Sequence, residues 1–193
     1  MTKWLSHRMV ERGIIKEEEQ ELYQFGIRNG MILLLNVGTA LVIGLLTEQL
    51  AVVAVFTLSF MVLRSYTGGY HSDSRVFCYL GSNLVLLVPV YTQAVFYKTS
   101  LAWLLAVLLV SAGIIFLLSP MHSKNRKLDK EEQKHFGRKA RLIAALELAV
   151  LGILWHAGQI PYAYAVYTGI CITALFMLVG KAQLWIQSHT ENG

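Results

Sequence analysis

The residues best suited to chemistry lie in a polar stretch between two apolar segments, "RSYTGGYHSDSRVFC" at 64–78. A cysteine thiol becomes a useful nucleophile when a partner removes its proton, and histidine is the side chain whose unperturbed pKa suits that task near neutral pH. His71 and Cys78 are therefore a candidate dyad for attack on a carbonyl group. Arg64 or Arg75 would add positive potential that favours the thiolate.

The spacing of His71 and Cys78 restricts the backbone between them. Seven residues of straight helix would place both side chains on one face but about 10.5 Å apart along the axis. That separation is too great for direct proton transfer. A dyad therefore requires a turn, which Gly68 and Gly69 make possible, and a new helix that carries Cys78 near its first turns, where the helix dipole favours a thiolate.

Each of these residues also has a purely structural interpretation. Free cysteines in membrane proteins are usually packed as small hydrophobic residues, which is our interpretation of Cys171 and an open alternative for Cys78. Gly68 and Gly69 can form an ordinary turn, and His71 can be an interfacial residue. Taken alone, a cysteine and a histidine in one loop are a weak signal of catalysis.

The segments that must position this loop are strongly apolar. The chain is 55% hydrophobic and 15% charged, with a mean hydropathy of +0.50, far from the balance of soluble proteins. Most apolar blocks reach or approach the roughly 20 residues that a helix needs to cross a bilayer. The blocks lie at 31–46, 50–63, 79–97, 101–120, 142–158 and 162–180. We predict an all-α polytopic membrane protein with about six transmembrane helices, forming a single membrane-embedded domain over 1–193.

Two segments depart from this simple pattern. The block 50–63 gives only about 21 Å of helix, so either Arg64 snorkels from a longer helix or the following loop dips into the membrane surface. Residues 1–29 are charged throughout and show no cleavable signal peptide. Their scattered apolar residues favour one or two amphipathic helices along the interface, broken near Gly13. A solvated cytoplasmic tail is the alternative.

The basic residues indicate an orientation. With six crossings, 16 of the 17 lysines and arginines fall on the side of the N-terminus, and only Lys98 falls on the other. The positive-inside rule then predicts that both termini, the 64–78 loop and the basic loop 121–141 are cytoplasmic. The expected location is the plasma membrane of a bacterial cell. The net charge of +5 is explained by topology and by attraction to anionic lipid, so no nucleic-acid partner is predicted.

Other classes of site lack their sequence patterns. The two cysteines form no tight cluster with histidines, so neither a metal site nor a disulfide framework is predicted. The chain contains no G-x-S-x-G, H-E-x-x-H or Walker motif, and no cofactor is expected. Glu147 and His156 are the only ionisable candidates inside the predicted helices, which is few for a transporter, and both can lie where helices pack.

The loop pattern resembles a known family. Arg64, Gly68, Gly69, His71 and Cys78 read as R-x3-GG-x-H-x6-C, which resembles the AgrB family of accessory gene regulator processing proteins. The acidic stretch "EEEQELYQFGIRN", the six apolar blocks and the stretch "SPMHSKNRKL" look like the corresponding regions of that family, so the resemblance covers nearly the whole chain. The family often has a proline just before the leucine of the last stretch, where this chain has Lys127, a difference that concerns local loop geometry.

The resemblance implies a membrane cysteine endopeptidase in quorum sensing. Its substrate would be an AgrD-type precursor peptide, and no cofactor or ATP would be needed. By the resemblance, His71 is the general base, Cys78 is the nucleophile, and Arg64, Gly68 and Gly69 support the site. A thioester acyl-enzyme would form as the C-terminal tail leaves, and a cysteine or serine of the peptide would then close a thiolactone or lactone ring.

Further interactions and functions stay open at this stage. Lys124, Arg126, Lys127 and Lys130 can attract an acidic precursor tail or anionic lipid, or can act only as topogenic charges. A homodimer is permitted by the glycines and alanines of the last two apolar blocks. The competing functions are a small membrane transporter or exporter, and a non-catalytic peptide-binding protein that would tolerate loss of Cys78.

Overall fold

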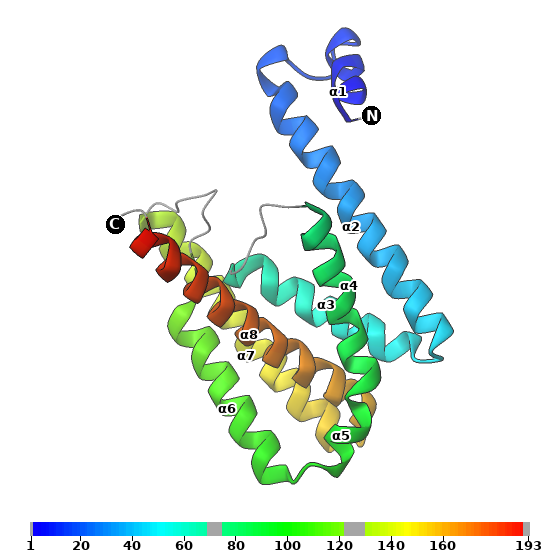
Figure 1. Cartoon of the computed structure of the whole chain (residues 1–193), viewed down its shortest axis with the longest axis vertical. Coiled ribbons are helices and arrows are strands. Elements are labelled where there is room, and N and C mark those ends of the chain that lie inside the picture. The colour runs from blue at the N-terminus through cyan, green and yellow to red at the C-terminus, as the bar shows by residue number, and fades with distance from the viewer. Residues whose placement is uncertain (1, 69–74, 122–129, 191–193) are drawn as a thin grey trace. The chain divides into compact units, whose positions relative to one another are not determined.

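The computed structural model describes residues 2–68, 75–121 and 130–190, and every regular element within those ranges is helical, which confirms the predicted all-α class. The elements are α1 (Thr2–Glu11), the 3-10 turn η1 (Glu17–Glu19), α2 (Gln20–Leu46), α3 (Leu50–Thr67), α4 (Arg75–Tyr91), α5 (Gln93–Lys98), α6 (Leu101–Leu118), α7 (Lys130–His156) and α8 (Ile160–Thr190) (Figure 1). The chain divides into two compact units, Met1–Thr39 and Ala40–Gly193, so the boundary falls within α2.

The N-terminal unit holds α1 and most of α2. Gly13 has a φ of +66° just after α1, which confirms the predicted break at this glycine. Within α1, the guanidinium carbon of Arg8 lies 4.6 Å from the ring centroid of the exposed Trp4. The second helix begins at Gln20, well before the apolar block 31–46, and runs without interruption to the end of that block.

Four helices in the described ranges are long and apolar enough to cross a membrane. They are Glu17–Leu46, Leu50–Thr67, Leu101–Leu118 and Ile160–Ile186. The second is longer than its apolar block because the helix continues through Arg64 to Thr67, in agreement with the first of the two alternatives for that block. The other two blocks correspond to the 17-residue α4 and to the C-terminal part of α7.

The block 79–97 is two helices where one was predicted. Helix α4 ends at Tyr91 and the short α5 follows. Pro89, inside α4, has no backbone N–H and disturbs the helical hydrogen bonding around it. The hydroxyl of Tyr164, on α8, donates to the carbonyl of Pro89 at 3.0 Å and lies 2.6 Å from the hydroxyl of Thr92. These bonds hold the interrupted backbone against α8.

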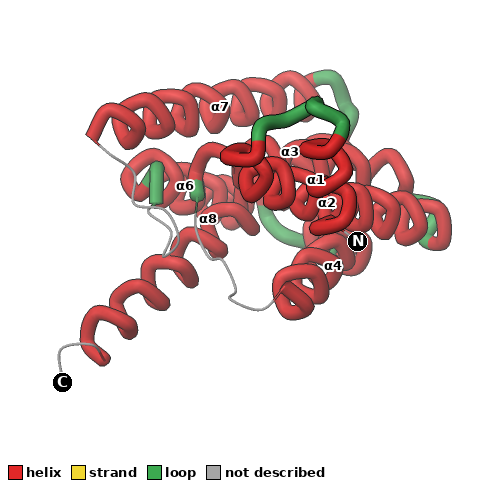
Figure 2. Tube along the Cα trace, turned by 90° about the horizontal axis from the view of Figure 1, so that it is seen from above, coloured by secondary structure: helices red, strands yellow, loops and turns green. Residues whose placement is uncertain are grey.

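Helix α8 is the centre of the larger unit, where it contacts α3, α4, α5, α6 and α7. Figure 2 shows this packing from a second direction, with α6 and α8 side by side. Two clusters of buried side chains form around α8. One contains Leu63, Ile115, Ala163, Ile170 and Met177, and the other contains Val53, Phe56, Leu86, Phe96 and Tyr164.

The closest helix contact joins α3 and α8 at Gly169. A methyl group added at Gly169 would collide with the hydroxyl of Ser59 and would lie 3.4 Å from the backbone nitrogen of Phe60. The same Ser59 hydroxyl donates to Glu147 on α7 at 2.7 Å. Small residues that allow close backbones and polar groups that bond across helices are the means by which membrane helices associate. Glu147 thus lies at a helix packing seam.

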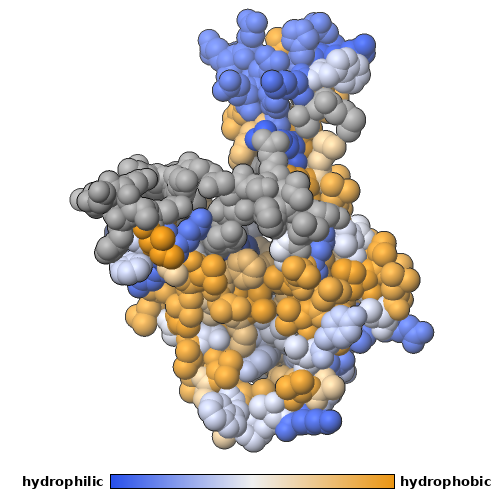
Figure 3. Space-filling model, in the orientation of Figure 1, coloured by the Kyte–Doolittle hydropathy of each residue, from blue (hydrophilic) through white to orange (hydrophobic). Residues whose placement is uncertain are grey.

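The outer surfaces of the larger unit are apolar. Trp103, Leu109 and Leu117 on α6 are 69%, 72% and 83% exposed, although large apolar side chains are usually buried in soluble domains. Orange, apolar atoms form a broad belt across this unit in Figure 3, and blue atoms dominate the surface of the N-terminal residues. Exposed apolar surface of this extent fits contact with lipid.

We expect Gly169→Ala to destabilise the protein by about 1–3 kcal/mol, because the methyl group overpacks the contact between α3 and α8. The matched control is Gly113→Ala in α6, where an added methyl group meets no atom within 4 Å. Thermal unfolding in detergent should show a lower midpoint for Gly169→Ala and an unchanged or slightly higher one for the control. Equal midpoints for the two variants would contradict the proposed close contact.

Candidate functional site

The candidate nucleophile lies at the start of α4. Cys78 is the fourth residue of that helix, which begins at Arg75, so the predicted position of the cysteine in the first turn is confirmed. The described helix therefore starts after His71, as a dyad requires. His71 and Gly69 lie outside the described residues, as does the side chain of Cys78. The dyad itself stays a prediction.

Arg64 bonds to the backbone at the end of α3. One guanidinium nitrogen, Nη1, donates to the carbonyl of Gly68 at 2.7 Å, and the guanidinium carbon lies 5.2 Å from the ring centroid of Phe176 on α8. The bond gives a partner to a carbonyl just beyond the last helical turn, and its cationic donor makes it a strong one. Arg64 therefore links the backbone just after α3 to α8.

Gly68 directs the chain out of α3 in a conformation that favours glycine. Its φ is +72°, and a β-carbon at this position would lie 2.5 Å from the carbonyl oxygen of Met121. The amide of Met121 in turn donates to the carbonyl of Thr67 at 2.9 Å. The end of α3 is thus fastened, backbone to backbone, to the segment that follows α6.

That segment, 119–121, also packs against α7 and α8. A β-carbon at Gly137 on α7 would lie 3.0 Å from Cδ of Pro120 and 3.5 Å from the carbonyl oxygen of Ser119. The hydroxyl of Ser119 lies 4.0 Å from the sulfur of Met177 on α8. Segment 119–121 is part of the "SPMHSKNRKL" stretch, but nothing in the sequence paired it with the end of α3 or indicated a role for Gly137.

Basic side chains of α7 lie beside the last turns of α3 and α6. Arg141 Nε donates to the carbonyl of Phe116 at 3.1 Å, and Lys139 Nζ lies 5.9 Å from the ring centroid of Tyr66. The region expected as the loop 121–141 is helical from Lys130 onward. The side chains of Lys124, Arg126, Lys127 and Lys130 lie outside the described part of the chain.

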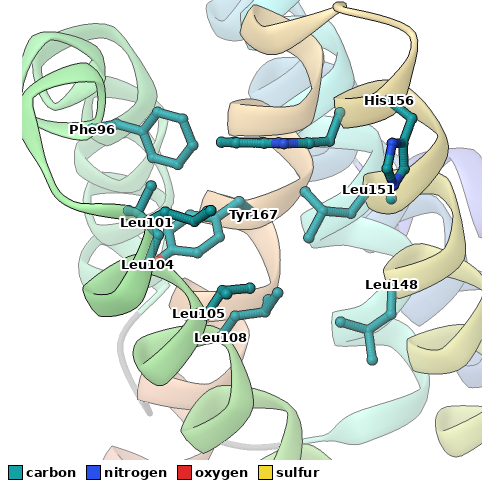
Figure 4. A pocket seen from close by; sticks show the side chains of 11 residues that line it. Phe96, Leu101, Leu104, Leu105, Leu108, Leu148, Leu151, His156 and Tyr167 are labelled. Atoms are coloured by element: carbon teal, nitrogen blue, oxygen red, sulfur yellow. The ribbon is translucent and has the colours of Figure 1, made fainter.

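Two apolar cavities lie away from this region. The first, of about 310 Å³, is lined by α5, α6, α7 and α8 and has His156 at its edge (Figure 4). The second, of about 380 Å³, shares Phe96, Leu104 and Tyr167 with the first and is also lined by Cys171. Cys171 is a partly buried free thiol in the middle of α8, which agrees with the interpretation of this residue as packed. Neither cavity borders Arg64, Gly68 or Met121.

Metal ligation has no support among the described residues, where no group of three or more histidine, cysteine, aspartate or glutamate side chains could hold an ion.

Comparisons with known proteins identify the family of this chain. The family model AgrB, Accessory gene regulator B, matches residues 1–178. An accessory gene regulator protein B of Staphylococcus intermedius is 26% identical over 156 residues, which cover 79% of this chain and 80% of that protein. An AgrB-like protein of Clostridium perfringens is 23% identical over 148 residues, which cover 74% of this chain and 69% of the relative. No solved structure matches.

The match spans the pattern at 64–78, the stretch 119–128 and all but the last part of α8. This coverage supports a role in accessory gene regulation and in the processing of an autoinducer precursor. The helices that fit a membrane agree with a membrane family. The chain belongs to the AgrB family.

Proposed function

We propose that this protein is a membrane cysteine endopeptidase that removes the C-terminal tail of an AgrD-type precursor peptide and promotes cyclisation of the remaining signal segment. The observation that carries the proposal is the position of Cys78 in the first turn of α4, which follows in sequence an α3 terminus that Arg64 and Gly68 fix in place. A helix N-terminus stabilises a thiolate.

The proposed reaction proceeds in two transfers. His71 accepts the proton of the Cys78 thiol, and the thiolate attacks the carbonyl carbon at the end of the signal segment. The amide bond to the tail breaks, its nitrogen leaves with the proton from His71, and a thioester remains on Cys78. A cysteine thiol or serine hydroxyl of the peptide then attacks this thioester, which closes the ring and returns the free thiol of Cys78.

Electrostatics supports a peptide substrate with an acidic tail. Lys139 on α7 lies beside Tyr66 near the end of α3, and Arg141 on α7 bonds to the carbonyl of Phe116 near the end of α6. We assign Lys124, Arg126, Lys127 and Lys130 to attraction of the acidic precursor tail or of anionic lipid headgroups, with each exposed charge near an anionic surface worth about 1 kcal/mol. The exposed apolar surface of α6 supports a membrane location for the protein, where a membrane-bound precursor would meet it.

A transporter is less well supported. Glu147 bonds to Ser59 where α3 and α7 meet, and His156 is exposed at the end of α7. Intramembrane ionisable groups on a transport path are expected to line a water-filled cavity or to pair in relays. Glu147 lines neither described cavity, and its observed partner serves helix packing.

We expect Cys78→Ala to abolish processing of a precursor peptide, because it removes the nucleophile. The full-length protein would be reconstituted in liposomes with the precursor encoded beside it, and products would be followed by mass spectrometry. Wild type should give a tail fragment and a product one water lighter than the linear signal segment. Cys171→Ala is the matched control and should process normally. Equal activity of Cys78→Ala and wild type would exclude Cys78 as the nucleophile.

Arg64→Lys should slow processing by on the order of ten-fold, because a hydrogen bond to a charged donor contributes about 1.5–3 kcal/mol. A lysine lacks the planar fork that reaches Gly68 while it covers the ring of Phe176. Arg138→Lys, at an exposed position on α7, keeps the same charge and is the control. Rates from the liposome assay would decide, and wild-type activity of Arg64→Lys would remove Arg64 from the site.

We also propose six crossings with both termini in the cytoplasm, with α4 and the C-terminal part of α7 as the two further spans. Single cysteines would be placed in a cysteine-free background at Lys98, at Lys134 and at Lys181, which are all exposed. An impermeant maleimide should label Lys98→Cys in intact cells and label the other two only after permeabilisation. External labelling of Lys134→Cys would contradict this orientation.

A further inference from the structure

Two backbone segments that are distant in sequence are joined by a hydrogen bond in the larger unit. One includes Gly68, which precedes residues 69–74, and the other ends at Met121, which precedes the basic residues 122–129. The amide of Met121 donates to the carbonyl of Thr67, so the backbone at the end of α3 meets the backbone that follows α6 at this hydrogen bond. Neither hydrophobic periodicity nor the charge pattern of the sequence requires this pairing.

The contact between the end of α3 and Met121 has almost no free space. A β-carbon at Gly68 would approach the carbonyl oxygen of Met121 to 2.5 Å, and Thr67 is fully buried. On the other side of the segment 119–121, a β-carbon at Gly137 would approach Cδ of Pro120 to 3.0 Å. The segment is therefore held between the end of α3 and the first turns of α7, with a glycine at each contact. Tight packing of this kind transmits small displacements.

We propose that the segment Ser119–Met121 is a positioning element for the peptidase reaction, and that Gly68 and Gly137 are the residues that seat it. The segment fixes the direction in which the chain leaves α3 toward Cys78. It also fixes the position at which the basic region begins, directly after Met121. The proposal rests on the proposed function, because it assigns a role in that reaction. Its residues do not touch the substrate, so they are positioning residues.

The sharpest test compares Gly68→Ala with Gly158→Ala. Both glycines have a positive φ, +72° and +70°, so alanine is strained at each, and the ψ of −152° at Gly68 lies in a region that essentially only glycine adopts. Only at Gly68 would the new methyl group also collide with Met121, since no atom lies within 4 Å of a β-carbon at Gly158. Gly68→Ala should lower kcat on the order of ten- to a hundred-fold with little change in KM, and Gly158→Ala should retain wild-type kcat.

Hydrogen exchange on the same variants tests the contact without measuring catalysis. Hydrogen exchange of the peptide that covers residues 119–121 reports the bond from the amide of Met121 to Thr67. Gly68→Ala should speed this exchange, and Gly158→Ala should leave it unchanged. Faster exchange in Gly68→Ala with a wild-type kcat would overturn the positioning role, as would wild-type exchange with a lowered kcat.

The second contact allows a double-mutant cycle. Gly137→Ala should lower kcat by a smaller factor than Gly68→Ala, because the clash is with a side-chain carbon and is less severe. Pro120→Ala removes that carbon, so the loss from Gly137→Ala should shrink in the Pro120→Ala background. Gly152→Ala, on α7 with no atom within 4 Å of the added methyl group, is the matched control. Additive effects of Gly137→Ala and Pro120→Ala would overturn the proposed contact.

Failure of this proposal can be distinguished from failure of the proposed function. If Cys78→Ala processes the peptide as wild type does, the peptidase mechanism falls, and the positioning role falls with it whatever the exchange data show. If Cys78→Ala is inactive while Gly68→Ala and Gly137→Ala keep wild-type kcat, the mechanism stands and only the positioning role is overturned. Loss of kcat in both glycine variants, with faster exchange at 119–121 and unaffected controls, supports it.

Discussion

The close approach of α3 and α8 is the contact on which the rest of the larger unit depends. Gly169 lets the backbone of α8 come against Ser59, and Ser59 extends the contact to α7 through its bond to Glu147. Lipid provides no hydrophobic force between helices, so this combination of a small residue and a buried polar pair has to hold three helices together. Arg64 and Phe176 continue the same pairing of α3 with α8 toward the candidate site.

The position of the site follows from that contact. With α3 fixed along α8, its last turn meets the segment after α6, and Gly68 and Met121 fasten the two. Helix α7 packs against the other side of the segment after α6 at Gly137. The proposed chemistry needs a thiol at a helix start and a base within reach of it. The described contacts fix the direction in which the chain leaves α3, and the proposed chemistry depends on that direction.

The sequence predicted the class of fold well because apolar blocks and charge asymmetry are local signals. It also predicted the helix start that holds Cys78 and the break at Gly13. It did not predict the division of 79–97, although Pro89 within that block is a local signal of a helix break. It also missed Gly137, whose role depends on contact with the segment after α6, which is distant in sequence. Such contacts leave no periodic pattern to read.

The most direct test of the central claim is intact-mass analysis of the protein during a single turnover with the precursor peptide. A cysteine peptidase that cyclises its product must pass through a thioester on its nucleophile. We expect a transient adduct with the mass of the peptide without its tail, located on Cys78 and released by hydroxylamine. Cleavage of the peptide without any adduct on Cys78, or with the adduct on another residue, would contradict it.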